Sequence, residues 1–194
     1  MAKKEQIGDV PGNILGMLAD LNHKLQHGKI TPGQLDRFLK KENPYDVTIT
    51  EKDEVLSVTV NRDRTIAEGI KAGEYNWSND SINDKNFKRT GKGTEVTEII
   101  LVHFDKSMST DKALKELEKR NLRPADLQEL LAIGEQHPDK QRQFPIIALG
   151  SVWQNPGGSR GVPYLLRGGS DRGLGLRWLG IDWGDVCRFA AVRK

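Results

Sequence analysis

The sequence has little of several residue types that support structure or chemistry on their own. It contains a single cysteine, Cys187, which excludes an internal disulfide framework and a cysteine-based zinc cluster. Aromatic residues make up only 6% of the 194 residues. The longest apolar runs, 98–104 and 144–152, are much shorter than the roughly 20 residues that a membrane-spanning helix requires. We therefore expect a protein without a membrane span.

The charge and the length of the chain further limit the class of protein to which it can belong. The chain carries 30 Lys and Arg against 27 Asp and Glu, a formal net charge of +3, and 36% of its residues are hydrophobic. This composition is that of a folded chain, and the length suits one domain, or one domain with an appendage. Residues 1–6 are charged and no apolar segment follows them, so we expect no signal peptide and a cytoplasmic location.

The first part of the chain, residues 1–45, predicts a small helical hairpin. Between residues 9 and 27, leucines recur at steps of three and four residues, which is typical of a helix with one apolar stripe. A second short helix is predicted over 31–39, where Thr31 and Gln34 form a capping-box pair. This appendage is a candidate for homodimer formation through the stripe of the first helix, which consists of Leu15, Leu18, Leu21 and Leu25.

The remaining residues, 46–194, predict an α+β domain. Alternating or continuous apolar residues indicate strands at 56–60, 95–104, 144–153, 162–167, 174–178 and 186–193. A capping box formed by Thr65 and Glu68 begins a short helix. Ten of the 20 glycines fall between residues 150 and 184, which is typical of the turns of an antiparallel sheet.

Two further helices are predicted over 109–120 and 124–133, with Pro124 at the first position of the second helix. Their apolar residues, including Leu117 and Leu130, are expected to face each other. The predicted fold is thus α+β, with a mainly antiparallel sheet, a helical hairpin packed on one face and a separate N-terminal helical hairpin.

Several segments also resemble a family of uncharacterised bacterial proteins. The matching stretches are 70–77, 122–125, 129–132, 144–151 and 188–193. The resemblance covers roughly residues 55–194 and leaves out the N-terminal hairpin. It implies a bacterial cytosolic protein, and it implies no activity.

Motifs for nucleotide and metal binding are incomplete. Residues 90–94 have the composition of a phosphate loop, but Asn86 stands where its first glycine belongs and a strand follows instead of a helix. His23 and His27 share a helix face, yet no third ligand is marked near them. The sequence therefore predicts no metal site and no cofactor.

Residues suited to catalysis stand in ordinary surroundings. Ser151 lacks the second glycine of a nucleophile elbow, and Cys187 lies inside a predicted strand, where a buried thiol is the usual outcome. His103 and Asp105 stand at the end of a strand, and Asp182 and Asp185 flank a turn-like dipeptide. We assign no catalytic residue, and the pattern argues against an enzyme.

The C-terminal third has the clearest binding signal. Residues 141–194 hold eight basic and three acidic residues, whereas residues 1–140 carry a net charge of −2. We predict a non-catalytic binding or protein-interaction module that contacts an anionic or acidic partner through Gly- and Arg-rich loops. The candidate contact residues are Arg160, Arg167, Arg172 and Arg177.

Two other classes remain open. The same segment contains three of the four tryptophans, and arginines with exposed aromatic rings can bind single-stranded nucleic acid. Trp178 shares an apolar face with Leu176, which instead predicts that Trp178 is in the core. An enzyme with no recognisable active-site motif is the third alternative.

Overall fold

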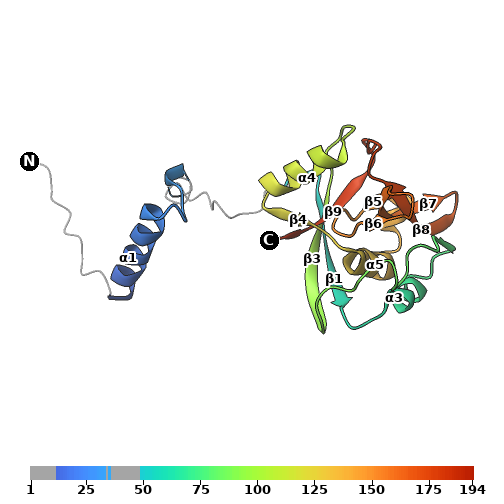
Figure 1. The fold of residues 1–194 in the computed structure, drawn as a ribbon, viewed down its shortest axis with the longest axis horizontal. Coiled ribbons are helices and arrows are strands. Elements are labelled where there is room, and N and C mark those ends of the chain that lie inside the picture. Colours follow the sequence, from blue (N-terminus) through green and yellow to red (C-terminus); the bar gives the residue numbers. More distant parts are fainter. Residues whose placement is uncertain (1–11, 34, 36–48) are drawn as a thin grey trace, which may run out of the picture. The chain divides into compact units, whose positions relative to one another are not determined.

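A computed structural model of the chain describes residues 12–33, 35 and 49–194 (Figure 1). The chain divides into two compact units, residues 1–46 and 47–194. No helix in the described part has both the length and the apolar character needed to cross a membrane.

In the first unit, helix α1 spans Gly12–Gln26 and confirms the helix predicted from the leucine spacing. Leu18 on this helix is exposed to solvent. Gly28 follows with a φ of 66°, a left-handed conformation that a glycine adopts at little cost where a helix ends. The second predicted helix, over 31–39, lies largely outside the described residues.

The second unit is built on a mixed, mostly antiparallel sheet, which confirms the α+β prediction (Figure 1). Its main path runs in the order β1-β3-β9-β5-β7-β8-β2, while β4 also pairs with β9 and β6 with β7. The contacts of β5 with β9 and of β2 with β8 are parallel. The nine strands in the described part are β1 (Glu54–Asn61), β2 (Trp77–Ser78), β3 (Thr94–Val102), β4 (Leu122–Pro124), β5 (Ile146–Ile147), β6 (Trp153–Gln154), β7 (Arg160–Gly168), β8 (Asp171–Trp178) and β9 (Arg188–Arg193).

In the described part of this unit, four helices connect the strands: α3 (Ile66–Ala72), α4 (Thr110–Lys119), α5 (Leu127–Gln136) and α6 (Lys140–Gln143). The capping box predicted for α3 is present, because the Thr65 hydroxyl accepts from the backbone N–H of Glu68 at 3.1 Å and the Glu68 carboxylate accepts from that of Thr65 at 2.8 Å. Gly73 caps the other end of α3. Local sequence signals therefore located this helix correctly.

Apolar side chains pack on both faces of the sheet. Along β3, Ile99 and Leu101 belong to the core layer that includes α5, whereas Ile100 and Val102 belong to the layer that includes α4. All four are fully buried, as is typical of an interior strand. β3 therefore carries core residues on both faces, which the sequence showed as a continuous apolar run.

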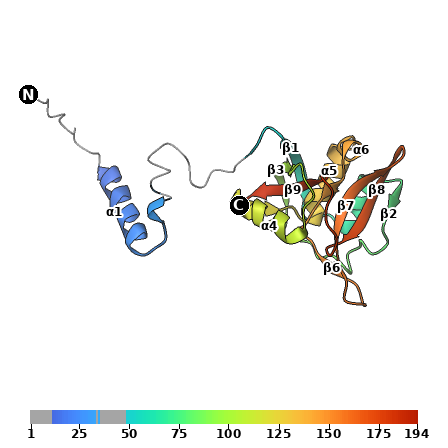
Figure 2. The ribbon, with the colours of Figure 1, turned by 90° about the horizontal axis from the view of Figure 1, so that it is seen from above.

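The predicted packing of α4 against α5 is wrong. Leu117 of α4 and Leu130 of α5 lie in different core layers, so the two helices cover opposite faces of the sheet (Figure 2). The reason is β4, which pairs with β9 and carries the chain from one face to the other between the helices. Pro124 consequently ends β4, and α5 begins at Leu127 after the N-cap Asp126.

The irregular segment after α3 packs through aromatic and aliphatic side chains. Ile82 and Phe87 are buried, whereas Trp77 is exposed. The Tyr75 hydroxyl lies against α5, where a Cβ added at Gly134 would be 1.8 Å away from it. This hydroxyl is buried without a hydrogen-bond partner, and its burial raises the pKa of Tyr75. A glycine is thus required at position 134, because the Tyr75 hydroxyl approaches the helix there too closely for a side chain.

We expect Gly134→Ala to lower the free energy of unfolding by about 1–3 kcal/mol, the usual cost of overpacking, although alanine favours a helix by about 1 kcal/mol. Tyr75→Phe removes the hydroxyl oxygen, which is the nearest of the clashing atoms, so the double variant should recover part of this loss. Urea denaturation followed by circular dichroism measures both effects.

The control is Gly168→Ala, because nothing lies within 4 Å of a Cβ at that glycine and its φ is not positive. A Gly134→Ala variant as stable as this control would contradict the packing described for Tyr75.

Candidate functional site

A groove of about 570 Å³ runs between the first turn of α4 and the neighbouring ends of β6, β7 and β8. We call it the α4 groove. Its walls combine aliphatic, hydroxyl and charged side chains. The residues that line it are Ser109, Thr110, Asp111, Leu114, Leu149, Val152, Ser159, Arg160, Trp178, Leu179 and Gly180.

Hydrogen bonds fix one wall of the groove to the other. The Thr110 hydroxyl donates to the carbonyl of Leu179 at 3.1 Å and accepts from the indole N–H of Trp183 at 3.0 Å. The backbones of Met108 and Trp183 also exchange hydrogen bonds of 3.0 and 2.8 Å. Because Trp183 is fully buried, these contacts hold the start of α4 against the segment after β8. The groove is therefore formed before any ligand binds.

Arg160 supplies the only cationic side chain among the residues that line the groove. It begins β7, and its carbonyl accepts from the backbone N–H of Leu179 at 2.9 Å, which fixes the arginine backbone beside β8. Asn155 stabilises the turn that precedes Arg160, because its side chain accepts a hydrogen bond from the Ser159 N–H at 2.9 Å. The Arg160 guanidinium is exposed and forms no hydrogen bond or ion pair with any described residue. Its charge is thus available to a ligand.

Exposed apolar side chains flank this arginine. Val152 is 49% exposed and Trp178 is 42% exposed, which corrects the prediction that Trp178 belongs to the core. The Trp178 ring stacks on Trp153, with centroids 6.3 Å apart, and lies over Gly161, where a Cβ would be 3.3 Å from it. Trp178 stands at the end of β8, so the helices that cover the sheet do not enclose it.

The four arginines predicted as contact residues are not gathered on one surface. Arg167 is exposed at the far end of β7, about 23 Å from Arg160 at 3.3 Å per residue. Arg177 is partly buried, with its guanidinium 5.6 Å from the ring centroid of Trp183. The structure brings only Arg160 into the α4 groove.

Arg172 departs most from the expectation of an exposed loop arginine. It is only 7% exposed, and its guanidinium donates to the carbonyl of Gly134 and to the side chain of Gln141. It also lies 5.3 Å from the centroid of the Tyr75 ring. The hairpin sequence suggested a solvated loop, but α5 and α6 cover this face of β8. Arg172 therefore packs the domain and is closed to an external partner.

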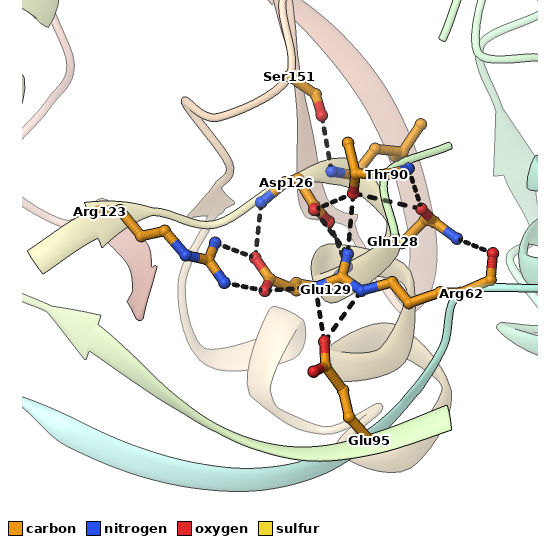
Figure 3. A network of polar contacts seen from close by, with 9 residues as sticks. Arg62, Thr90, Glu95, Arg123, Asp126, Gln128, Glu129 and Ser151 are labelled. Atoms are coloured by element: carbon orange, nitrogen blue, oxygen red, sulfur yellow. Dashed lines mark hydrogen bonds and ion pairs between the residues drawn. The ribbon is translucent and has the colours of Figure 1, made fainter. Parts of the chain in front are cut away.

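A second polar cluster, centred on Arg62, is shown in Figure 3. Arg62 is buried and donates to Asp126 at 2.6 Å, to Glu129 at 2.8 Å and to Glu95 at 3.0 Å. Arg123 binds the same Glu129 carboxylate through two bonds of 3.0 and 2.7 Å. Burial lowers the pKa of Arg62, but its carboxylate partners outweigh that effect and raise the pKa above its ordinary value.

We call this cluster the Arg62 network. Its polar groups form hydrogen bonds with one another. Gln128 donates to the Arg62 carbonyl at 3.1 Å and accepts from Thr90 N–H at 2.8 Å. The Ser151 hydroxyl accepts from Leu127 N–H at 2.9 Å, beside the network. These bonds tie the end of β1, the loop before β3 and the start of α5 together, so we assign the network a structural role.

The other residues that were considered for catalysis or metal binding also make structural contacts. Burial raises the pKa of the Cys187 thiol, which disfavours the nucleophilic thiolate. His103 contacts the carbonyl of Asp185 at 2.8 Å. Among the described residues, no group of three His, Cys, Asp or Glu side chains is arranged to hold a metal ion.

Comparison of the chain with protein-family models, with curated proteins and with solved structures finds no match. The α4 groove was only partly visible in the sequence. Arg160 and Ser159 belong to the Gly- and Arg-rich segment, but Leu114 comes from α4, which is far away in the chain. We therefore derive the function from the chemistry of the groove.

We expect Arg62→Met to lower the free energy of unfolding by roughly 3–5 kcal/mol, because it leaves the fully buried carboxylate of Glu129 with one cationic partner fewer. Guanidinium chloride would screen the charges, so urea denaturation is the measurement.

Arg193→Met is the matched control. Arg193 pairs with Glu98, and both side chains of that pair are exposed, so its loss should cost less than about 1 kcal/mol. Equal losses in the two variants would contradict the structural role of the Arg62 network.

Proposed function

We propose that the protein is a non-catalytic binding module whose α4 groove holds an acidic segment of a partner protein. The observation that supports this function most directly is the exposed Arg160 guanidinium, which lies in the groove without a partner among the described residues. A guanidinium binds a carboxylate through two parallel hydrogen bonds, so a side chain of Asp or Glu is the ligand group it fits best.

The aliphatic walls favour a polypeptide over a small inorganic anion. Leu114, Leu149 and Val152 line the groove, and Trp178 borders it with 42% of its surface exposed. Covering these side chains releases water from apolar surface, which is favourable at about 25 cal/mol per Å². A ligand that presents an aliphatic side chain next to a carboxylate uses both kinds of contact.

Single-stranded nucleic acid has less support as a ligand. A strand of phosphates needs a track of cations, yet Arg160 is the only cation lining the groove, Arg172 is buried and Arg167 lies at the other end of the hairpin. One of the three tryptophans that suggested base stacking, Trp183, belongs to the core. The carboxylate of Asp111 also lines the groove and disfavours a polyanion.

Three further properties belong to this proposal. We assign the module to the cytoplasm of a bacterium, in line with the composition and with the resemblance of residues 55–194. No cofactor takes part in binding a peptide. Leu18 is exposed on α1, which supports self-association of the N-terminal helix as a homodimer.

We expect Arg160→Gln to weaken the binding of acidic peptides roughly tenfold or more, because a hydrogen bond to a charged group contributes about 1.5–3 kcal/mol. Asp111→Asn should strengthen the same binding a few-fold, because it removes a like charge from the groove. An array of immobilised peptides graded in acidic and aliphatic content, followed by calorimetric titration, measures both changes.

Arg167→Gln is the matched control, since Arg167 is also an exposed arginine of the same hairpin but lies outside the groove. Equal affinity for acidic, neutral and basic peptides, or equal losses in Arg160→Gln and Arg167→Gln, would rule out the proposed site.

A further inference from the structure

β6 is a strand with one neighbour. It pairs with β7 through Trp153 with Gly161 and Gln154 with Arg160, and no other described strand pairs with it. Val152, the residue before β6, and Arg160, which pairs with Gln154 across the ladder, both line the α4 groove. The unpaired edge of β6 therefore borders the site proposed above.

Hydrogen bonds around β6 show which way its backbone groups point. The carbonyl of Arg160 accepts from Leu179, so the polar backbone groups of Arg160 face β8. Gln154 stands opposite Arg160 and thus forms a non-hydrogen-bonded pair with it. The next residue, Asn155, donates its N–H to Ser159 at 2.9 Å, which agrees with this alternation. The N–H and carbonyl of Gln154 consequently point away from β7.

These outward groups have no partner within the described part of the chain. No hydrogen bond from another described residue reaches the backbone N–H or carbonyl of Gln154, and the same holds for Val152. Unpaired backbone groups on a sheet edge are a template for another strand. The edge of β6 is therefore open to strand addition.

The outer edge of β1, at one end of the sheet, shows what a protected edge looks like. On β1, the Gln136 side chain accepts from Thr59 N–H and donates to the Thr59 carbonyl, both at 2.8 Å. The His137 ring contacts the carbonyl of Ser57 at 3.0 Å. Side chains of α5 thus occupy the outer edge of β1, whereas the described residues offer no such cover at Gln154.

We infer that the acidic partner segment binds as an extended strand added to the free edge of β6. This inference rests on the proposed function and specifies how that partner is recognised. Main-chain hydrogen bonds to Gln154 would supply affinity, while Arg160 and the aliphatic wall would select side chains. Arg160 and Gln154 are cross-strand neighbours, so the selective cation lies beside the groups that pair with the added strand.

The alternation of side chains along a strand then determines which sequence pattern the partner segment must have. Successive side chains of an extended segment point to opposite faces, so only every second residue faces the groove. The partner class is thus a segment with an acidic and an aliphatic residue two positions apart. A segment with these residues adjacent would turn one of the two away from the groove.

The test uses the full chain and a synthetic strand-forming peptide, rich in threonine, with Glu and Leu two positions apart. Gln154→Pro removes the outward N–H without removing a hydrogen bond to β7, and proline is tolerated at such an edge position. We expect it to weaken peptide binding about 3- to 10-fold relative to Gln154→Ala, which removes the side chain only. Circular dichroism of the two variants establishes that both are folded.

Two measurements on the unaltered protein keep the inference independent of that variant. A peptide N-methylated at alternate residues, in the register that would pair with β6, should bind at least several-fold more weakly than one methylated in the other register. A peptide with Glu and Leu adjacent should also bind more weakly than the spaced one.

The outcomes separate the two proposals. If Arg160→Gln weakens binding but Gln154→Pro, Gln154→Ala and both N-methylated peptides bind alike, the strand-addition mode is wrong and the acidic-segment site stands. If the spaced peptide does not bind the unaltered protein and Arg160→Gln has no effect on any acidic peptide, the proposed function itself fails.

Discussion

The backbone of β9 must find hydrogen-bond partners along both edges, because this strand is buried in the middle of the sheet. β3 occupies one edge, where Leu101 pairs with Ala190. The other edge is shared, since β5 pairs with the first residues of β9 and β4 with the last ones. Three segments that are far apart in the sequence thus meet on one strand near the C-terminus.

This sharing explains the position of the α4 groove. Because β4 lies in the plane of the sheet, the chain passes through that plane between α4 and α5, and each helix covers its own face. α4 then stands beside the ends of β7 and β8, where Thr110 binds the carbonyl of Leu179. The position of the groove is therefore a consequence of strand pairing.

The Arg62 network stabilises the packing of α5 on the other face of the sheet. Glu129 is fully buried and receives two arginines, one from the end of β1 and one from β4, so it connects both segments to α5. Leaving such a carboxylate unpaired would be costly, which makes the geometry of this region specific. The two polar clusters differ in kind: the Arg62 network is satisfied internally, whereas Arg160 has its charge free for a partner.

Local and tertiary signals contributed different parts of this structure. The sequence by itself determined the capping box of Thr65 and Glu68, the interior strand around Ile99–Val102 and the α+β class, because propensity, capping and periodicity act between near neighbours. The sequence also indicated Arg160 as a contact residue, but it did not show that Arg160 lies apart from Arg167 and Arg172. The burial of Arg172, the separation of α4 from α5 and the exposure of Trp178 were decided only by the tertiary structure. Each depends on which distant strand or helix covers a residue, and a pattern within one segment holds no information on that packing.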